Sequence, residues 1–224
     1  KWLKLEIESL HENEQKEVFK LIRKDNNKYY NSLYFITKNH FQFFDKIKLV
    51  PFGEFLPFRN KLKFLEAIVG EVDLKEGKKN RLINTTYNFN FIPVICYEII
   101  FFNDLLSKIN QKSPILINIT NDAWFGKHSG PYQHFYLSRI RSTEFNKFLI
   151  RVSNNGVSAT IDNYGKIINY LPLNQKGIQN IRINTSSELN NLFSFHQLIY
   201  LVIIIVTIIA VTIEKRIGKL QPKI

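Results

Sequence analysis

Short, continuous apolar runs are the most regular feature of the chain. Phe91–Ile95 and Ile115–Ile119 each stand between polar residues, and uncharged runs of this length are typical of strands buried on both faces of a sheet. Similar runs, separated by turns that contain Asn or Gly, predict further strands over Tyr29–Thr37, Phe41–Phe44, Phe148–Val152, Val157–Ile161, Ile167–Leu171 and Ile178–Ile183. The chain is therefore expected to contain more sheet than helix.

Helical spacing is found in fewer places. Tyr132–Phe145 alternates apolar and charged residues in the manner of an amphipathic helix, and Pro131 suits the first turn. Glu12–Lys24 predicts a second helix, because three of its apolar residues follow an i, i+3, i+4 pattern. Shorter helical segments are expected at Leu62–Val69 and Asp104–Ile109. Strands and helices in this order predict a layered α/β or α+β domain.

One aromatic-rich loop separates these elements. Asp45–Pro57 contains two prolines and a glycine, which exclude a regular strand or helix. Lys46 and Glu54 lie in it, and rigid scaffolds often display functional side chains from such loops. Taken singly, either residue is equally compatible with a solvated surface charge.

The C-terminal part of the chain has a different pattern. Residues 191–213 contain no Asp, Glu, Lys or Arg, and their number is close to the ~20 that a helix needs to cross a bilayer core. The alternative is a long buried strand or a core helix. Lys215 and Arg216 lie in the basic tail 214–224, which predicts a cytoplasmic C-terminus and a domain on the periplasmic side.

Charge restricts the partners. The chain has 31 Lys and Arg against 19 Asp and Glu, a net charge of +12, which favours anionic partners such as nucleic acid or a phospholipid surface. The lysines are scattered rather than interleaved with stacking aromatics, and the apolar C-terminal segment favours the membrane, so no nucleic acid is expected. A single cysteine excludes an intrachain disulfide.

That cysteine, Cys96, follows Phe91–Ile95 directly and precedes a stretch that is expected to begin a helix. Backbone N–H groups at such a junction favour a reactive thiolate. The alternative is a buried structural cysteine, which is common for a lone Cys in an apolar run. His128 and His134 are the nearby histidines, but neither stands in an obvious relation to Cys96, so a Cys–His pair is the weaker assignment.

Six ordered motifs decide between these alternatives. They are Tyr30-Asn31-Ser32-Leu33, Asp45-Lys46 through Leu49-Val50-Pro51-Phe52-Gly53-Glu54, Ile95-Cys96-Tyr97-Glu98, Asn121-Asp122-Ala123-Trp124-Phe125-Gly126, Gly130-Pro131 with Gln133-His134, and Ser153-Asn154-Asn155-Gly156. Together they resemble the C-terminal part of the bacterial apolipoprotein N-acyltransferases, membrane-embedded members of the nitrilase (carbon–nitrogen hydrolase) superfamily.

The resemblance implies a four-layer αββα nitrilase-like sandwich within residues 1–190, N-terminally incomplete, followed by one transmembrane helix. It also implies a Glu–Lys–Cys triad, in which Cys96 matches the nucleophile and Lys46 the catalytic lysine. Glu54 matches a further glutamate that the family needs. Tyr97 and Glu98 match residues used around the nucleophile.

The family's chemistry is implied in the same way. The thiolate attacks an ester of a phospholipid, typically phosphatidylethanolamine, and forms a thioester. The amino group of a diacylglyceryl-cysteine in an apolipoprotein then takes the acyl chain. Membrane, phospholipid and apolipoprotein are the implied partners, the bacterial inner membrane is the implied location, and neither a cofactor nor a metal is expected.

Three residues of the fourth motif are candidates for substrate binding. Trp124 and Phe125 are expected either to line an acyl pocket or simply to pack their loop, and Asn121 lies beside them.

The general base is where the chain departs from the family. The family's glutamate follows a proline ahead of the Tyr-Asn-Ser-Leu motif, and the residues before Tyr29 contain no proline. The base is therefore expected upstream of Lys1, and its identity is left unknown. The alternative functions are a membrane-tethered nitrilase-type amidase and a non-catalytic fragment that lacks the base.

Overall fold

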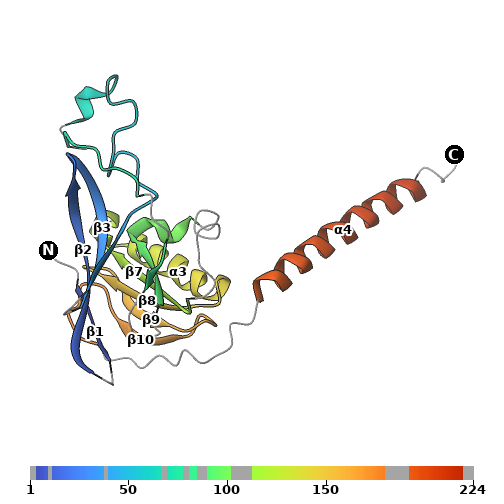
Figure 1. The fold of residues 1–224 in the computed structure, drawn as a ribbon. Coiled ribbons are helices and arrows are strands. Elements are labelled where there is room, and N and C mark those ends of the chain that lie inside the picture. Colours follow the sequence, from blue (N-terminus) through green and yellow to red (C-terminus); the bar gives the residue numbers. More distant parts are fainter. Residues whose placement is uncertain are drawn as a thin grey trace. The chain divides into compact units, whose positions relative to one another are not determined.

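The computed structural model describes residues 4–9, 12–37, 40–66, 70–77, 81–84, 90–101, 113–179 and 192–218. The chain forms two compact units, Lys1–Ser187 and Glu188–Ile224, and each is described by itself. The sheets and helix α3 belong to the first unit, and helix α4 belongs to the second (Figure 1).

The first sheet is antiparallel and has the order β1-β2-β3-β4 among the described residues. Asn26 and Asn27 join β2 to β3, and their φ angles of 46° and 60° are those of a two-residue hairpin turn. The strands expected at Tyr29–Thr37 and Phe41–Phe44 are both present and pair with each other as an antiparallel hairpin. The strands are β1 (Lys4–Ser9), β2 (Glu12–Asp25), β3 (Lys28–Ile36) and β4 (Phe41–Asp45).

The helix predicted over Glu12–Lys24 is wrong, because this segment is strand β2. Glu17–Asp25 pairs residue by residue with Lys28–Ile36. Of the apolar residues at helical spacing, Val18 is buried but Ile22 is 57% exposed. The tight asparagine turn returns the chain alongside itself, and pairing with the aromatic-rich β3 outweighs a weak helical pattern.

The second sheet has the order β10-β9-β8-β7-β6-β5 in the described part of the chain. Its centre is parallel, since β6 pairs with β7 and β7 with β8 in the same direction. The two apolar strands Phe91–Ile95 and Ile115–Ile119 are therefore neighbours in this sheet. The strands are β5 (Ile83–Asn84), β6 (Asn90–Ile95), β7 (Ile115–Thr120), β8 (Phe148–Ser153), β9 (Ser158–Ile161) and β10 (Ile167–Leu171).

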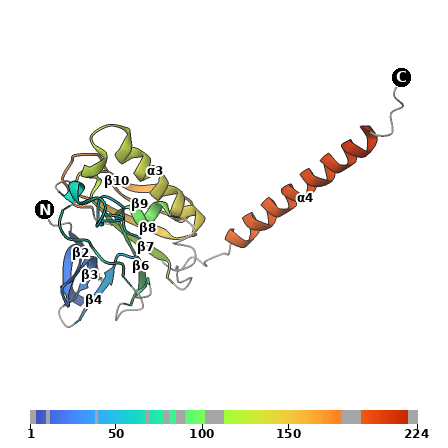
Figure 2. The ribbon, with the colours of Figure 1, turned by 90° about the horizontal axis from the view of Figure 1, so that it is seen from above.

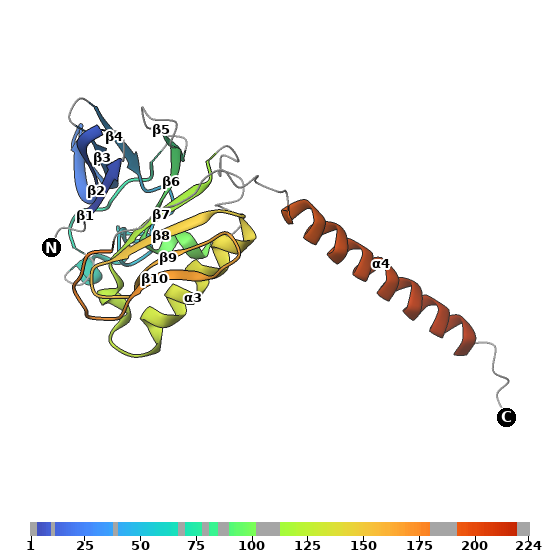
Figure 3. The same ribbon diagram turned by 90° about the horizontal axis from the view of Figure 1, so that it is seen from below.

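Alternating side chains of the second sheet fill two separate cores. Phe91 and Ile95 of β6 join a cluster with residues of the first sheet, including Leu33. Ile92 and Val94 of β6 join another cluster, to which α3 contributes. The second sheet is thus the middle layer, as Figures 2 and 3 show, between the first sheet and α3 (Ser129–Glu144).

The described residues supply three layers of the predicted αββα sandwich. Helix α3 confirms the helix expected at Tyr132–Phe145 and begins slightly earlier, at Ser129. No α-helix other than α3 occurs in the described part of the first unit. The nitrilase-like α/β class is supported, and the fourth layer stays a prediction.

The smaller predicted elements had mixed outcomes. Lys63–Leu65, within the expected helix at Leu62–Val69, forms the short 3₁₀ helix η1, and residues 67–69 lie outside the described ranges. The expected helix at Asp104–Ile109 lies outside the described residues. Ile178 and Gln179 do not continue the predicted strand Ile178–Ile183, and the rest of that segment is not described.

Helix α4 (Leu192–Gly218) covers nearly all of the apolar segment 191–213, so this segment is helical rather than a strand. Between Ile199 and Ile213 its large apolar side chains are exposed. No helix within the described ranges has both the length and the apolar content needed to cross a membrane.

A buried ion pair fastens the loop after β4 to the turn after β6. Arg81 and Glu98 are almost fully buried, and Arg81 Nη2 lies 2.8 Å from Glu98 Oε1. The same oxygen accepts hydrogen bonds from the backbone N–H groups of Ile47 (2.9 Å) and Lys48 (3.0 Å). Oε2 accepts from Arg81 Nη1 at 3.0 Å and from the Ile95 N–H at 2.9 Å. One carboxylate thus ties together three segments that are distant in sequence.

Arg81→Met is expected to lower the free energy of unfolding by about 3–5 kcal/mol, because it leaves the Glu98 charge buried without its partner. Urea denaturation followed by tryptophan fluorescence measures this change. Lys61→Met, at an exposed loop lysine, is the control and should stay within about 0.5 kcal/mol of the wild type. Equal stability of the two variants would show that the ion pair does not hold these segments.

Candidate active site

Cys96 occupies a strained position at a strand end. Strand β6 ends at Ile95, and the 3₁₀ helix η2 (Cys96–Ile100) begins directly after it. The φ angle of Cys96 is +53°, in the left-handed region that residues with a Cβ rarely adopt. Such strain is concentrated at functional sites, and a sharp strand-to-helix turn is one way to present a nucleophile at the edge of a sheet. The thiol is free and only partly buried.

Lys46 and Glu54, predicted from the loop after β4, meet as an ion pair. Lys46 Nζ lies 2.5 Å from Glu54 Oε2, and the lysine side chain is 1% exposed. Glu54 Oε1 accepts a hydrogen bond of 2.6 Å from Asn31 Nδ2, and Oε2 accepts from the Val50 N–H at 2.8 Å. The glutamate is therefore held in place from β3 and from its own loop, and it fixes the lysine in turn.

The Glu98 carboxylate couples this pair to the turn that carries Cys96. Its bonds to the N–H groups of Ile47 and Lys48 hold the residues that follow Lys46, and Glu98 itself lies two residues after Cys96. Ile47 and Cys96 pack against the same core cluster. The pKa of Glu98 would be raised by burial, but Arg81 and the backbone donors outweigh this effect and lower it. Glu98 is thus ionised at neutral pH, and its contacts hold the surrounding segments together.

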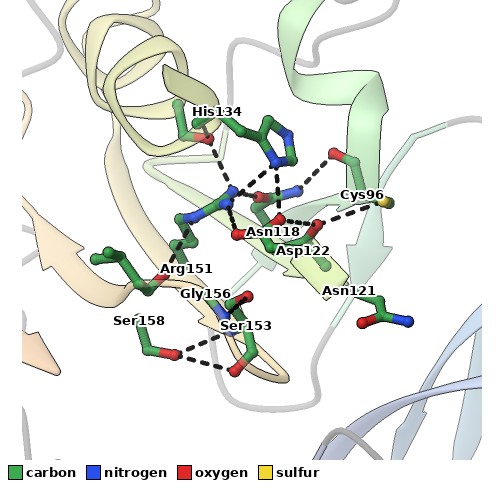
Figure 4. Close-up of polar contacts among 12 residues, drawn as sticks. Cys96, Asn118, Asn121, Asp122, His134, Arg151, Ser153, Gly156 and Ser158 are labelled. Atoms are coloured by element: carbon green, nitrogen blue, oxygen red, sulfur yellow. Dashed lines mark hydrogen bonds and ion pairs between the residues drawn. The ribbon is translucent and has the colours of Figure 1, made fainter. Parts of the chain in front are cut away.

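A second polar network lies on the other side of Cys96, toward α3 (Figure 4). Thr120 Oγ1 lies 3.4 Å from Cys96 Sγ and 3.0 Å from Asp122 Oδ1. His134 Nδ1 is 2.9 Å from the same Asp122 oxygen, and Arg151 Nη2 donates to Oδ2 at 2.7 Å. These residues come from the ends of β7 and β8 and from α3, so the network closes the carboxyl edge of the parallel strands.

The network combines the ion pair of Asp122 and Arg151 with the imidazole ring of His134. Burial alone would raise the pKa of Asp122, but the bond to His134 and the charge of Arg151 lower it. Burial lowers the pKa of His134 and Arg151 adds to this, although Asp122 acts in the opposite direction. His134 is therefore expected to be neutral at pH 7. Among the described residues, its ring forms no hydrogen bond to Cys96 Sγ, in agreement with the weak assignment of a Cys–His pair.

Aromatic rings cover the network. Tyr97, directly after Cys96, packs on His134 and Phe125 with centroid separations of 5.9 and 6.0 Å. Trp124 is 76% exposed, whereas the Asn121 side chain accepts a hydrogen bond from the Ala123 N–H and so caps the 3₁₀ helix η3 (Asp122–Phe125). Phe125 and Asn121 have packing and capping contacts here, and the substrate-binding roles of all three stay predictions.

The sequence indicated some of these residues but not the side chains with which they form hydrogen bonds and ion pairs. Lys46, Glu54, Cys96 and Glu98 were singled out, and their catalytic or supporting roles stay predictions. The partners Arg81, Thr120, Asp122 and Arg151 were missed. A signal existed for Arg151, because a charged residue inside the apolar run Phe148–Val152 has to find a buried counter-charge.

Comparison with known proteins agrees with this geometry. The chain is 40% identical over 182 residues to the apolipoprotein N-acyltransferase of Rickettsia prowazekii (strain Madrid E), with 79% of this chain and 36% of that protein covered. It is 43% identical over 156 residues to that of Rhizobium rhizogenes (strain K84 / ATCC BAA-868), with 67% and 29% covered. The chain thus spans about a third of the length of these curated relatives.

Two solved structures share the fold at low identity. Nit3 of Saccharomyces cerevisiae, a member of branch 10 of the nitrilase superfamily, has a TM-score of 0.51 at 19% identity, with 70% of this chain and 55% of that chain covered. The amidase NitN from Neterenkonia sp. AN1 has a TM-score of 0.53 at 12% identity, with 77% and 64% covered. The family model for carbon-nitrogen hydrolase matches residues 9–188. The resemblance drawn from the six motifs is confirmed, and the chain belongs to the carbon-nitrogen hydrolase family.

Proposed function

We propose that the chain is the thiol-bearing part of an apolipoprotein N-acyltransferase, which moves a fatty acyl chain from a phospholipid to the amino group of a diacylglyceryl-cysteine. The observation that carries the proposal is Cys96 at its left-handed turn, joined through Glu98 to the buried Lys46–Glu54 pair. The similarity to apolipoprotein N-acyltransferases supports this reaction over others of the superfamily.

In the first half-reaction the Cys96 thiolate attacks the ester carbonyl carbon of the phospholipid. A C–S bond forms, the carbonyl becomes an oxyanion, and the bond to the glycerol oxygen then breaks. Lys46 is the group proposed to hold the oxyanion, since Glu54 occupies one N–H of its ammonium and an ammonium has three. The glycerol oxygen takes the proton that the general base removed from the thiol, so the products are a thioester on Cys96 and a lysophospholipid alcohol.

In the second half-reaction the acceptor's amino group attacks the thioester. A C–N bond forms, the general base takes one proton from the attacking amino group, the C–S bond breaks, and the sulfur leaves as the thiolate, which takes this proton back. Trp124, which is exposed, and Phe125, which packs beside Tyr97, are the proposed apolar surfaces for the acyl chain. Asn121 would contribute by holding their loop through its capping bond.

The proposal includes attachment to the bacterial inner membrane. Residues 191–213 would anchor the chain, with 1–190 on the periplasmic side and 214–224 in the cytoplasm. Two features support this: the exposed apolar side chains of α4 and the basic residues that follow segment 191–213. A phospholipid donor of the phosphatidylethanolamine class and an apolipoprotein acceptor complete the scheme.

Incubation of the full-length enzyme with phosphatidylethanolamine vesicles is expected to add one acyl chain to Cys96, detected as an intact-mass increase that neutral hydroxylamine reverses. Cys96→Ser should show no such thioester, because it lacks the thiol. Lys46→Met should slow adduct formation by about 10²–10³-fold, since it removes the proposed oxyanion cation. Lys48→Met, an exposed lysine of the same loop, is the matched control and should retain the wild-type rate.

Two outcomes would overturn the assignment. Absence of an adduct together with ammonia release from small amides would identify an amidase. Equal adduct formation in Lys46→Met and Lys48→Met would remove Lys46 from the mechanism.

The single cysteine also allows a test of membrane sidedness. In intact spheroplasts, a small membrane-impermeant thiol reagent is expected to label Cys96 without permeabilisation, because the domain is proposed to face the periplasm. In the double variant Cys96→Ser/Lys223→Cys the label should appear only after the membrane is permeabilised. The reverse pattern would contradict the proposed orientation, and Cys96→Ser alone reports background labelling.

A further inference from the structure

Thr120 stands at the edge of the second sheet, level with Cys96. It is the last residue of β7, and the residue before it, Ile119, pairs in register with Ile95, the last residue of β6. Its backbone is fixed on the other side as well, because it pairs with Ser153 of β8. The Thr120 side chain is fully buried, so the fold holds its hydroxyl in one place beside the sulfur.

The Thr120 hydroxyl lies between two possible acceptors. Its Oγ1 is 3.4 Å from Cys96 Sγ, within hydrogen-bond reach of a sulfur atom, and 3.0 Å from Asp122 Oδ1. A hydroxyl has one hydrogen, which rotates about the C–O bond, and two lone pairs that accept. It can therefore donate to the carboxylate or to the sulfur, but not to both at once.

Asp122 stays compensated without this hydroxyl. Its Oδ1 also lies 2.9 Å from His134 Nδ1, and its Oδ2 accepts from Arg151 Nη2 at 2.7 Å (Figure 4). An ionised carboxylate only accepts, so the hydrogen of the neutral His134 ring is the one on Nδ1. Asp122 thus keeps one donor on each oxygen and a cation beside it when Thr120 turns away.

The protonation state of Cys96 decides where the hydroxyl points. As a thiol, Cys96 can donate its S–H to Thr120 Oγ1, whose own hydrogen then points at Asp122. A thiolate has no hydrogen and is the stronger acceptor, because hydrogen bonds to ionised groups are about twice as strong as neutral ones. The Thr120 hydrogen is then better placed on the sulfur than on an aspartate that keeps two other donors.

We propose that Thr120 is a rotating hydrogen-bond donor, which stabilises the Cys96 thiolate and turns back to Asp122 when the sulfur is acylated. This inference rests on the proposed acyl transfer and adds to it a residue that touches the reacting sulfur. Thr120 keeps its own proton throughout, so removal of the S–H proton remains the task of the general base.

The same donor serves the second half-reaction. In the thioester the sulfur is uncharged and a weak acceptor, so the hydroxyl points at Asp122. When the amino group attacks and the C–S bond breaks, negative charge builds up on the sulfur and the hydroxyl turns toward it again. An interaction that is stronger in the transition state than in the thioester lowers the barrier to release of the acyl chain.

Other charged or titratable groups surround the sulfur and have to stay constant in a test of this role. They are Lys20 on β2, Lys46 and Glu54 in the loop after β4, Glu98 in η2, Asp122 in η3, His134 in α3 and Arg151 on β8. A change of Thr120 to valine removes the hydroxyl and leaves all of these side chains in place. A shift in the pH dependence of Cys96 reactivity is then assigned to the lost hydrogen bond.

The test is the rate at which iodoacetamide alkylates Cys96 in the full-length enzyme between pH 6 and 10, read from the mass of the peptide that carries Cys96. Thr120→Val is expected to react about tenfold more slowly than wild type at pH 7, because the thiolate loses a charge-assisted hydrogen bond. At pH 10, where thiols ionise without help, the two rates should converge.

Two further variants separate the hydroxyl from the shape of the side chain. Thr120→Ser keeps the hydroxyl and should stay within about threefold of wild type at pH 7. Thr160→Val is the matched control, because Thr160 is a buried threonine of β9 whose Oγ1 forms no hydrogen bond within the described residues. Thr160→Val should follow the wild-type profile at every pH.

The outcomes distinguish the two proposals. A hydroxyl-dependent alkylation profile, in an enzyme that forms no acyl adduct with phosphatidylethanolamine vesicles, would retain Thr120 as the donor and overturn acyl transfer. Adduct formation together with identical profiles for Thr120→Val and Thr160→Val would overturn the role of Thr120 and retain acyl transfer. A rate loss in Thr120→Val that is equal at pH 7 and pH 10, or that Thr120→Ser shares, would identify a structural defect and would also overturn this role.

Discussion

The arrangement of the site depends on one buried carboxylate. Glu98 accepts hydrogen bonds from Arg81 and from backbone N–H groups on both sides of the site, so the loop that carries Lys46 and the turn that carries Cys96 are fixed to the same atoms. A charge this deeply buried is stable only with full compensation. Because the donors that compensate the Glu98 charge come from both loops, the buried carboxylate fixes the position of one loop relative to the other.

A second constraint holds Cys96 from the opposite side. The left-handed backbone of Cys96 is unfavourable for a residue with a side chain, and it persists only if its surroundings impose it. Asn118 Nδ2 donates to the Cys96 carbonyl at 3.3 Å, and Arg151 Nη1 holds Asn118 at 2.6 Å. Arg151 also pairs with Asp122, so the polar network supports the strained turn as well as closing the sheet edge. Its primary contribution is therefore geometric.

The sequence predicted the parts of this structure that local pattern determines. The apolar strands Phe91–Ile95 and Ile115–Ile119 and the helix around Tyr132 follow from periodicity and burial, and the fold class follows from their order. Lys46, Glu54 and Cys96 were found because short motifs occurred in a recognisable order. Arg81 could not be assigned to Glu98 in this way, because their pairing depends on tertiary positions 17 residues apart in sequence.

The one wrong helix had the largest consequence for the architecture of the first sheet. On a charged amphipathic helix, Lys20 would be one solvated lysine among many, and nothing in its neighbours would distinguish it. Once Asn26 and Asn27 turn β2 back along β3, alternation carries Val18 and Lys20 to the inner face, and the register sets Lys20 diagonal to Asn31. The hairpin turn thus decides both the topology of the first sheet and which side chains of β2 face the core between the two sheets.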